Sequence, residues 1–420
     1  MALSHTRKAG VTAALRPAHR EAVSRFERAL DALQHLPESR ERTELAIDIT
    51  FDLRNSLQAL GELKRLLDYI RKAQAQADVI GDRRRLGQAS AFACQYYRLS
   101  GDIGRAIQAG ERAVAIADEL GDPQLGIATR GFLGPALAAG GDNRHAVEVL
   151  TSAVERMRGD QAHDAMGTTG IMSVFLRIYL AMALAELGNF SAAMRHAEAA
   201  YRIAEAVGHV YSITFACYGI GTIRVLRGEI DESITILERG LELCRSWNLP
   251  VALPLLGASL GNAYCLAGRP QEAIGLLEEA ERQASAMGRL GGHAILLVRL
   301  GEAYLQVVRI PDARRCADIA LSLSQENKER AFEAYALRLL GDLGSHDRSV
   351  PEEAETFYCR ATALAEELQM QPLLAQCHLD LCRLYRRADR QASAETHLNM
   401  ASALFQALDM PYWLKQTKAN

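Results

Sequence analysis

The sequence lacks the segments that would mark a membrane protein or a secreted protein. No run approaches the roughly 20 consecutive apolar residues that cross a bilayer. The basic N-terminus around Arg7 and Lys8 is not followed by the apolar core of a signal peptide. The eight cysteines lie singly in apolar patterns and none forms a CxxC pair, so we expect buried, reduced thiols. Together these absences predict a cytoplasmic protein.

An excess of charge of one sign is also missing. The chain carries 48 Lys and Arg residues against 51 Asp and Glu residues, a formal net charge of −3. Such a chain has no general attraction for phosphate groups, and we do not expect nucleic acid as a partner. The short cluster of Arg83, Arg84 and Arg85 is typical of a solvated helix start.

Motifs of catalysis are missing as well. The chain holds neither the P-loop pattern GxxxxGK[ST] nor HExxH. Residues 257–261 (GASLG) match GxSxG, but the hydrolase elbow needs a preceding strand, and here the surrounding pattern is helical. The histidines lie singly in the sequence, although pairing in space stays open. We therefore expect no catalytic residue, no metal site and no cofactor, and hence no enzyme.

What the sequence does contain is a repeat. Small residues recur at intervals of 40 to 47 residues along almost the whole chain. No single compact core produces so regular a spacing, which is typical of one supersecondary unit copied many times. The positions are Ala29, Ala73, Ala113, Ala153, Ala200, Gly240, Ala280, Ala320, Ala361 and Ala401.

Each unit has the pattern of a helical hairpin. In residues 84–121, apolar and small residues recur with helical spacing on both sides of the dipeptide Gly101-Asp102. Cys94 and Ala106 flank this turn at positions that are small in most units. Small residues at a helix crossing let the two axes approach closely.

This pattern resembles the tetratricopeptide repeat, in about ten units of about 40 residues. The resemblance implies an all-α fold, a right-handed superhelical solenoid of tetratricopeptide-like helical hairpins. We expect residues 1–410 to form the solenoid and residues 411–420 to form a C-terminal cap or tail. The apolar residues Trp413 and Leu414 could cover the open face of the last helix.

Some positions depart from the pattern. Arg54 occupies a slot that is small in other units, Arg224 stands where a Tyr or Leu is expected, and Val308 replaces the turn glycine. Extra residues fall within residues 158–170, and residues 344–351 have the composition of a second irregular loop. We expect both segments to map to loops.

In stacked hairpins the first helix of each unit lines the concave face. Residues just after the small slot, and one turn later, should therefore face the groove. Their mixture of polar and basic side chains suits an extended peptide or a partner helix, because arginines can bind carboxylates in a bidentate way. The candidate binding residues are Gln95, Arg98, Met182, Thr222, Asn262, Glu302, Arg383 and Arg386.

Several stretches carry a closer resemblance. They are residues 20–30 (REAVSRFERAL), 35–39 (HLPES), 48–60 (DITFDLRNSLQAL), 81–87 (GDRRRLG), 384–387 (LYRR) and 407–414 (ALDMPYWL). They resemble the C-terminal repeat region of bacterial signalling proteins that carry an adenylate/guanylate cyclase domain and an AAA-type ATPase domain. The resemblance implies a regulatory role in bacterial cytosolic signalling. The first unit has a short leading helix and no obvious cap, so we expect its N-terminal edge to dock on an upstream ATPase or cyclase domain, another protein or a second copy.

Two hypotheses for function follow. The chain is a non-enzymatic scaffold that binds protein or peptide in its concave groove, or it is a sensor that binds a small effector and regulates an ATPase or cyclase in trans. A peptide groove should be open, charged and long, whereas a sensor should have a closed pocket with a few convergent polar groups.

Overall fold

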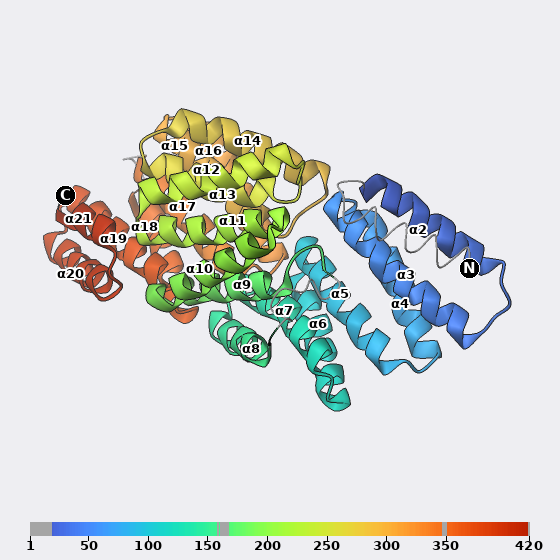
Figure 1. The fold of residues 1–420 in the computed structure, drawn as a ribbon. Coiled ribbons are helices and arrows are strands. Elements are labelled where there is room, and N and C mark those ends of the chain that lie inside the picture. The colour runs from blue at the N-terminus through green and yellow to red at the C-terminus, as the bar shows by residue number, and fades with distance from the viewer. Residues whose placement is uncertain (1–18, 158, 160–167, 347–350, 419–420) are drawn as a thin grey trace.

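The computed structural model describes residues 19–157, 159, 168–346 and 351–418, and no strand occurs among them. Nine complete helical hairpins follow one another, preceded by α2 (His19–Gln34) and followed by α21 (Pro411–Lys418). The leading helix expected for the first unit lies outside the described residues. The all-α solenoid predicted from the repeat is confirmed (Figure 1).

The helices of the hairpins are regular in length. The leading helices are α3 (Arg40–Ala59), α5 (Arg83–Leu99), α7 (Pro123–Ala139), α9 (Met172–Glu186), α11 (Val210–Arg227), α13 (Leu253–Leu266), α15 (His293–Gln306), α17 (Arg330–His346) and α19 (Gln371–Arg387). The trailing helices are α4 (Leu63–Val79), α6 (Ile103–Leu120), α8 (Asn143–Arg156), α10 (Phe190–Val207), α12 (Ile230–Ser246), α14 (Pro270–Ala286), α16 (Ile310–Glu326), α18 (Pro351–Glu367) and α20 (Gln391–Ala407).

The repeated small residues are buried where neighbouring helices touch. All nine alanines of the series are at most 1% exposed, and Gly240 is buried too. At the crossing inside a hairpin the space is tighter still. A Cβ on Gly221 would lie 2.3 Å from Leu237 Cγ, and one on Gly261 would lie 2.5 Å from Leu277 Cγ. Real Cβ contacts are much longer, so these positions have to be small.

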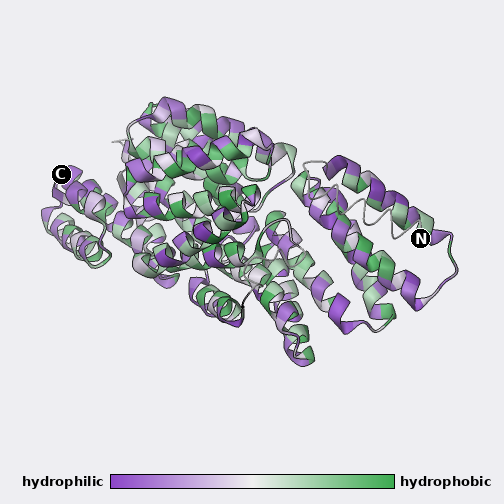
Figure 2. Cartoon of the chain, viewed as in Figure 1, coloured by the Kyte–Doolittle hydropathy of each residue, from purple (hydrophilic) through white to green (hydrophobic). Residues whose placement is uncertain are grey.

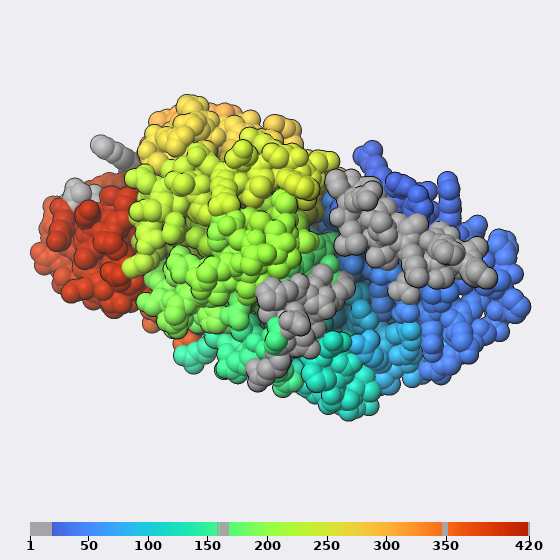
Figure 3. Space-filling view, viewed as in Figure 1, coloured from blue at the N-terminus to red at the C-terminus, as the bar shows by residue number. Residues whose placement is uncertain are grey.

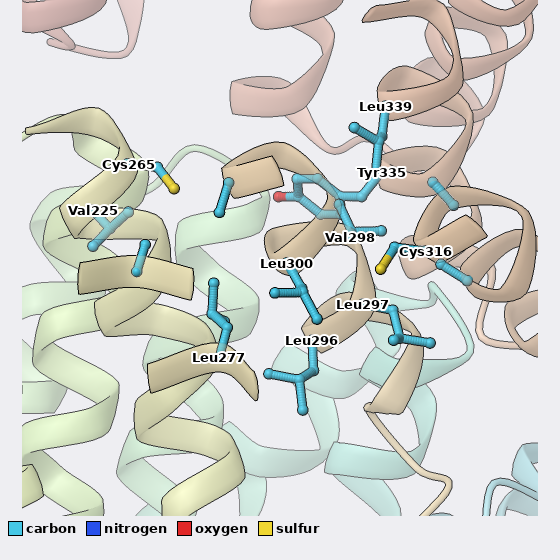
Figure 4. Close-up of a cluster of buried hydrophobic side chains, with 14 of the residues drawn as sticks. Val225, Cys265, Leu277, Leu296, Leu297, Val298, Leu300, Cys316, Tyr335 and Leu339 are labelled. Carbon is cyan, nitrogen blue, oxygen red and sulfur yellow. The ribbon is translucent and has the colours of Figure 1, made fainter. Parts of the chain in front are cut away.

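Each hairpin buries one face of each helix in a core that runs along the solenoid. Apolar and polar residues alternate around every helix in Figure 2, as expected of amphipathic helices that stack on both sides. Figure 4 shows one section of this core, where Leu277 of α14, Leu296 and Leu300 of α15, and Tyr335 of α17 converge. Burial of such side chains contributes about 1.5–3 kcal/mol each.

The departures from the repeat have local explanations. Arg54 is fully buried, with its guanidinium 3.7 Å from the centre of the Phe92 ring and donating to Gln95 Oε1 at 2.5 Å. Burial lowers its pKa to about 9. Arg224 lies 3.6 Å from the Glu229 carboxylate. Val308 adopts the left-handed conformation of the glycine that it replaces, with φ of 62°.

Two expectations from the sequence need correction. The expected loop at residues 344–351 is shorter, because α17 continues to His346 and α18 begins at Pro351; residues 347–350 lie outside the described part. Cys359 is exposed, while the other seven cysteines are free and buried as predicted. Most of the insertion at 158–170 lies outside the described residues.

The solenoid turns far enough for its second half to contact its first half. The turns that join the two helices of the early hairpins lie against inter-hairpin segments of the later ones: Gly61 against Met287, Gly101 against Asn327, and Gly141 against Leu368. Gly291 N donates to Leu99 O at 2.9 Å, and Arg227 pairs with Asp409. We call this set of contacts the cross-turn contact. In Figure 3 the red C-terminal helices lie directly beside the green segment.

The C-terminal helix α21 takes part in this contact. Trp413 stacks on Phe405 of α20 with ring centres 6.2 Å apart, and Tyr412 packs against Gly228 at the end of α11. This packing is compatible with the expected cap, but the division into a solenoid of residues 1–410 and a cap or tail of residues 411–420 stays a prediction.

Candidate functional site

A cavity lies inside the superhelix, between the leading helices. Its volume is about 220 Å³, and its wall is built mainly by α5, α7, α9, α11, α13, α15 and α17, with the segment that joins α14 to α15. We call it the central cavity. A smaller one, of about 70 Å³, has Phe132, Phe175, Tyr211 and Phe215 in its wall, and we call it the aromatic cavity.

The two cavities share part of their walls. Arg98, Pro135, Tyr179, Leu255 and Arg289 line both. Arg98 belongs to α5 in the first half of the chain, and Arg289 follows α14 in the second half. The cross-turn contact therefore brings together two arginines that are far apart in the sequence.

Two carboxyl groups in the wall of the central cavity have an oxygen without a partner among the described residues. Glu186 Oε1 accepts from the Tyr335 hydroxyl at 3.4 Å, and Glu329 Oε1 accepts from Gly292 N at 2.8 Å. In both, Oε2 is buried and makes no hydrogen bond within the described part of the chain. Burial raises the pKa of each carboxyl to about 7, because low-dielectric surroundings disfavour the charged form.

The cations of the cavity differ in how they are neutralised. Arg299 donates to both oxygens of Glu302, at 3.0 and 2.9 Å, and lies over the Tyr335 ring. Arg98 and Arg289 have no carboxylate of a described residue within ion-pair distance. Arg289 donates instead to the carbonyls of Gly291 and Val251, at 3.3 and 3.1 Å.

The sequence-predicted candidates fall into three groups. Arg98, Met182, Thr222 and Asn262 line the central cavity, and Gln95 lines the aromatic cavity together with Arg98. Glu302 lies just behind the wall as the partner of Arg299. Arg383 and Arg386 line neither cavity, and Arg383 is 3.5 Å from Asp380. Whether any of the eight binds a ligand stays a prediction.

Three polar residues of the cavity wall were not among the predicted groove residues: Glu186, Arg289 and Glu329. Glu186 lies one helical turn after Met182, so the spacing could have found it. Arg289 and Glu329 precede their leading helices, outside the helix faces from which the groove residues were predicted. They reach the cavity only because the inter-hairpin segments turn inwards, which the repeat pattern does not encode.

Chemistry of other kinds has little support. Within the described part of the chain, no three His, Cys, Asp or Glu side chains are arranged to hold a metal ion. None of the described helices combines the length and the apolar character that crossing a bilayer requires. The motif at residues 257–261 lies inside α13, as the flanking pattern predicted. His378 and His397 pair in space, with Nδ1 atoms 3.0 Å apart, away from both cavities.

Comparison with known proteins places the fold among helical-repeat proteins of the tetratricopeptide type. No protein-family model and no curated protein sequence matches this chain. A Rap protein complexed with Competence and Sporulation Factor is similar in structure, with a TM-score of 0.54 at 12% identity over 97% of this chain and 98% of that one.

Two further solved structures have the same architecture. The Rap conjugation gene regulator of plasmid pLS20, in complex with the Phr* peptide, has a TM-score of 0.56 at 12% identity over 87% of this chain and 96% of that one. The apo form of the quorum sensor NprR from B. thuringiensis has a TM-score of 0.51 at 13% identity over 86% and 99%.

Proposed function

We propose that this protein is a non-enzymatic regulatory scaffold of the bacterial cytoplasm that binds a short peptide, or the end of a partner protein, inside its superhelix. The observation that carries the proposal is the central cavity. Leading helices from α5 to α17 surround it, and its wall holds charged, hydroxyl and aromatic groups side by side. Pockets of this kind, apolar with a few convergent polar groups, are typical ligand sites.

The structural likeness supports a peptide as the ligand class. Of the three solved structures named above, one is a complex with the Phr* peptide, one is a complex with Competence and Sporulation Factor, and one is described as a quorum sensor. In this chain the leading helices present Asn262 and Thr222 to the cavity. An amide and a hydroxyl can bond the N–H and C=O groups of a peptide backbone.

A small effector is the second candidate, and the cross-turn contact favours it. The contact brings distant parts of the superhelix together beside the cavity, so the site is shorter than the long groove expected for an extended peptide. A scaffold that closes around its ligand changes shape when the ligand leaves. In that form the protein would regulate an ATPase or cyclase in trans, with α2 at the N-terminal edge as the docking face.

The test is to identify what the protein carries. We would purify the wild type and the variant Ala258→Trp from the native cytosol and analyse bound molecules by native mass spectrometry. Ala258 lines the central cavity, and an indole there fills it. Ala392→Trp, at an exposed site on α20, is the matched control.

We expect a peptide to be recovered from the wild type and the control but not from Ala258→Trp. Recovery of a non-peptide metabolite with the same dependence would select the second candidate. Equal recovery from all three proteins would contradict a ligand site in the central cavity.

A further inference from the structure

We propose that Arg98 and Arg289 form an anion site that bridges the two halves of the superhelix, and that an anionic group of the ligand, a carboxylate or a phosphate, binds between them. The inference rests on the proposed function and names the chemical class of the ligand. We call the pair the cross-turn anion site.

Arg98 and Arg289 meet at the cross-turn contact. The two arginines line both cavities and are presented from different halves of the chain. Arg98 donates to the Tyr179 hydroxyl at 3.3 Å, with its guanidinium 5.5 Å from the centre of that ring. Arg289 is only 8% exposed and is held by two backbone carbonyls. These neutral acceptors fix the orientation of the guanidiniums without cancelling their charge.

The charges of Arg98 and Arg289 call for an anion. A buried cation is strongly destabilising unless an anion accompanies it. Two other arginines of the interior have a carboxylate beside them: Arg338 lies 2.6 Å from Asp380, and Arg299 lies 2.9 Å from Glu302. Among the described residues neither the buried Arg289 nor the half-buried Arg98 has one within ion-pair distance. Burial together with repulsion from Arg98 lowers the pKa of Arg289. An anion between them would remove that repulsion.

Glu329 does not fill this role. Both guanidiniums act to lower the pKa of its carboxyl group, but burial outweighs them and raises that pKa to about 7. At neutral pH the group therefore supplies only part of a negative charge, and its Oε1 already accepts from Gly292 N. Arg98 and Arg289 bring two guanidinium groups to the surroundings of this single carboxyl group, which favours an anionic ligand group between them.

The surroundings of the two arginines also suit an apolar part of the ligand. The aromatic cavity opens beside the two arginines and is walled by Phe175, Tyr211 and Phe215. It can take an apolar or aromatic group next to the anion. A peptide that ends in an apolar residue offers this combination, since its terminal carboxylate adjoins its last side chain. A guanidinium binds a carboxylate in a bidentate way.

The test uses two peptide pools and inorganic phosphate. One pool contains random pentapeptides without Asp or Glu and with free C-terminal carboxyl groups, and the other is the same pool with C-terminal amides. Retention is measured by ultrafiltration and mass spectrometry for the wild type, Arg98→Met and Arg289→Met. Arg315→Met, at an exposed site on α16, is the matched control. Hydrogen exchange of the Gly291 amide, which donates to Leu99 O, reports closure.

We expect the wild type and Arg315→Met to retain the free-acid pool at least tenfold better than the amide pool, and each cavity variant to lose this preference. If phosphate alone slows Gly291 exchange in the wild type but not in Arg289→Met, while the pools are retained equally, the anion is a phosphate. Circular dichroism of each variant establishes that it is folded. Arg98→Lys and Arg289→Lys keep the charge and should restore part of the preference.

Two outcomes separate the proposals. Equal retention of both pools by the wild type and both cavity variants, with no effect of phosphate, would overturn the cross-turn anion site and leave peptide binding standing. Retention of neither pool, with no effect of phosphate, would count against the anion site and against peptide binding together.

Discussion

At the scale of single residues, the fold depends on positions where the side chain must be small and on positions where the backbone must adopt a left-handed turn. The alanine series and the turn glycines were readable from the sequence because each repeats in a fixed place relative to a local pattern. The side-chain contacts of Arg54, and the pairing of His378 with His397, were not readable. Arg54 contacts Phe92 and Gln95 of the next unit, and the two histidines meet across the two helices of one hairpin. The spacing along a single helix describes neither contact.

Two glycines of one hairpin give a matched test of the small slots. A Cβ on Gly261 would lie 2.5 Å from Leu277 Cγ, whereas nothing lies within 4 Å of one on Gly275 in α14. We expect Gly261→Ala to lower the free energy of unfolding by about 2 kcal/mol through overpacking. Gly275→Ala should raise it by about 1 kcal/mol, because alanine favours a helix over glycine. Urea unfolding followed by circular dichroism measures both, and equal effects would contradict the assigned crossing.

Val308 tests the reverse change, from a larger residue to glycine. It is an exposed β-branched residue at φ of 62°, where most units have glycine. The left-handed conformation costs a residue with a Cβ roughly 1–2 kcal/mol. This strain is larger than the conformational entropy that a glycine would lose on folding at the same position. We expect Val308→Gly to raise the free energy of unfolding by about 1 kcal/mol, measured by urea titration. A lower stability would mean that the turn has another conformation.

At the scale of the element, the leading helices provide the wall of the central cavity, as the concave-face argument predicted. Met182, Thr222 and Asn262 line it because successive units present equivalent helix faces. Arg383 and Arg386 on α19 hold equivalent positions but lie beyond the enclosed part. Glu186 and Glu329 add buried carboxyl groups that the repeat itself does not require.

These two carboxyl groups predict a pH dependence of stability. The pKa of each is raised to about 7 in the folded chain, above the ordinary value of about 4.3 in an unfolded chain. Their contribution to stability is therefore fully present below pH 4 and is lost as the pH rises to about 7.

Glu186→Gln combined with Glu329→Gln removes this contribution. We expect the urea midpoint of the double variant to fall less than that of the wild type between pH 5 and pH 7.5. Because burial also raises the pKa of Asp342, the difference between the two proteins is the informative quantity. Parallel curves would contradict the burial of these groups.

At the scale of the whole molecule, the property that matters is closure. Local patterns specify each hairpin. The curvature of the solenoid is the sum of small rotations between successive units, and contacts between distant residues then hold its two halves together. This is why the hairpins could be predicted from the sequence while the central cavity and Arg289 could not. The cross-turn contact also makes the ligand site depend on the shape of the entire chain.

Gly291 is the position where closure is most sensitive to size. A Cβ there would lie 1.9 Å from the Arg98 carbonyl oxygen, so Gly291→Ala cannot keep the bond between Gly291 N and Leu99 O. We expect this variant to retain its helix content, because each hairpin contacts mainly its neighbours. The two halves should separate, and ligand retention should fall with them.

Small-angle X-ray scattering of the monomer, collected in line with size exclusion, tests the closed solenoid most directly. We expect the wild-type curve to match the closed structure and Gly291→Ala to have a larger maximum dimension at equal helix content, with Gly275→Ala unchanged. A wild-type particle as long as an open array of the same hairpins, or a Gly291→Ala curve identical to that of the wild type, would rule out the closed solenoid.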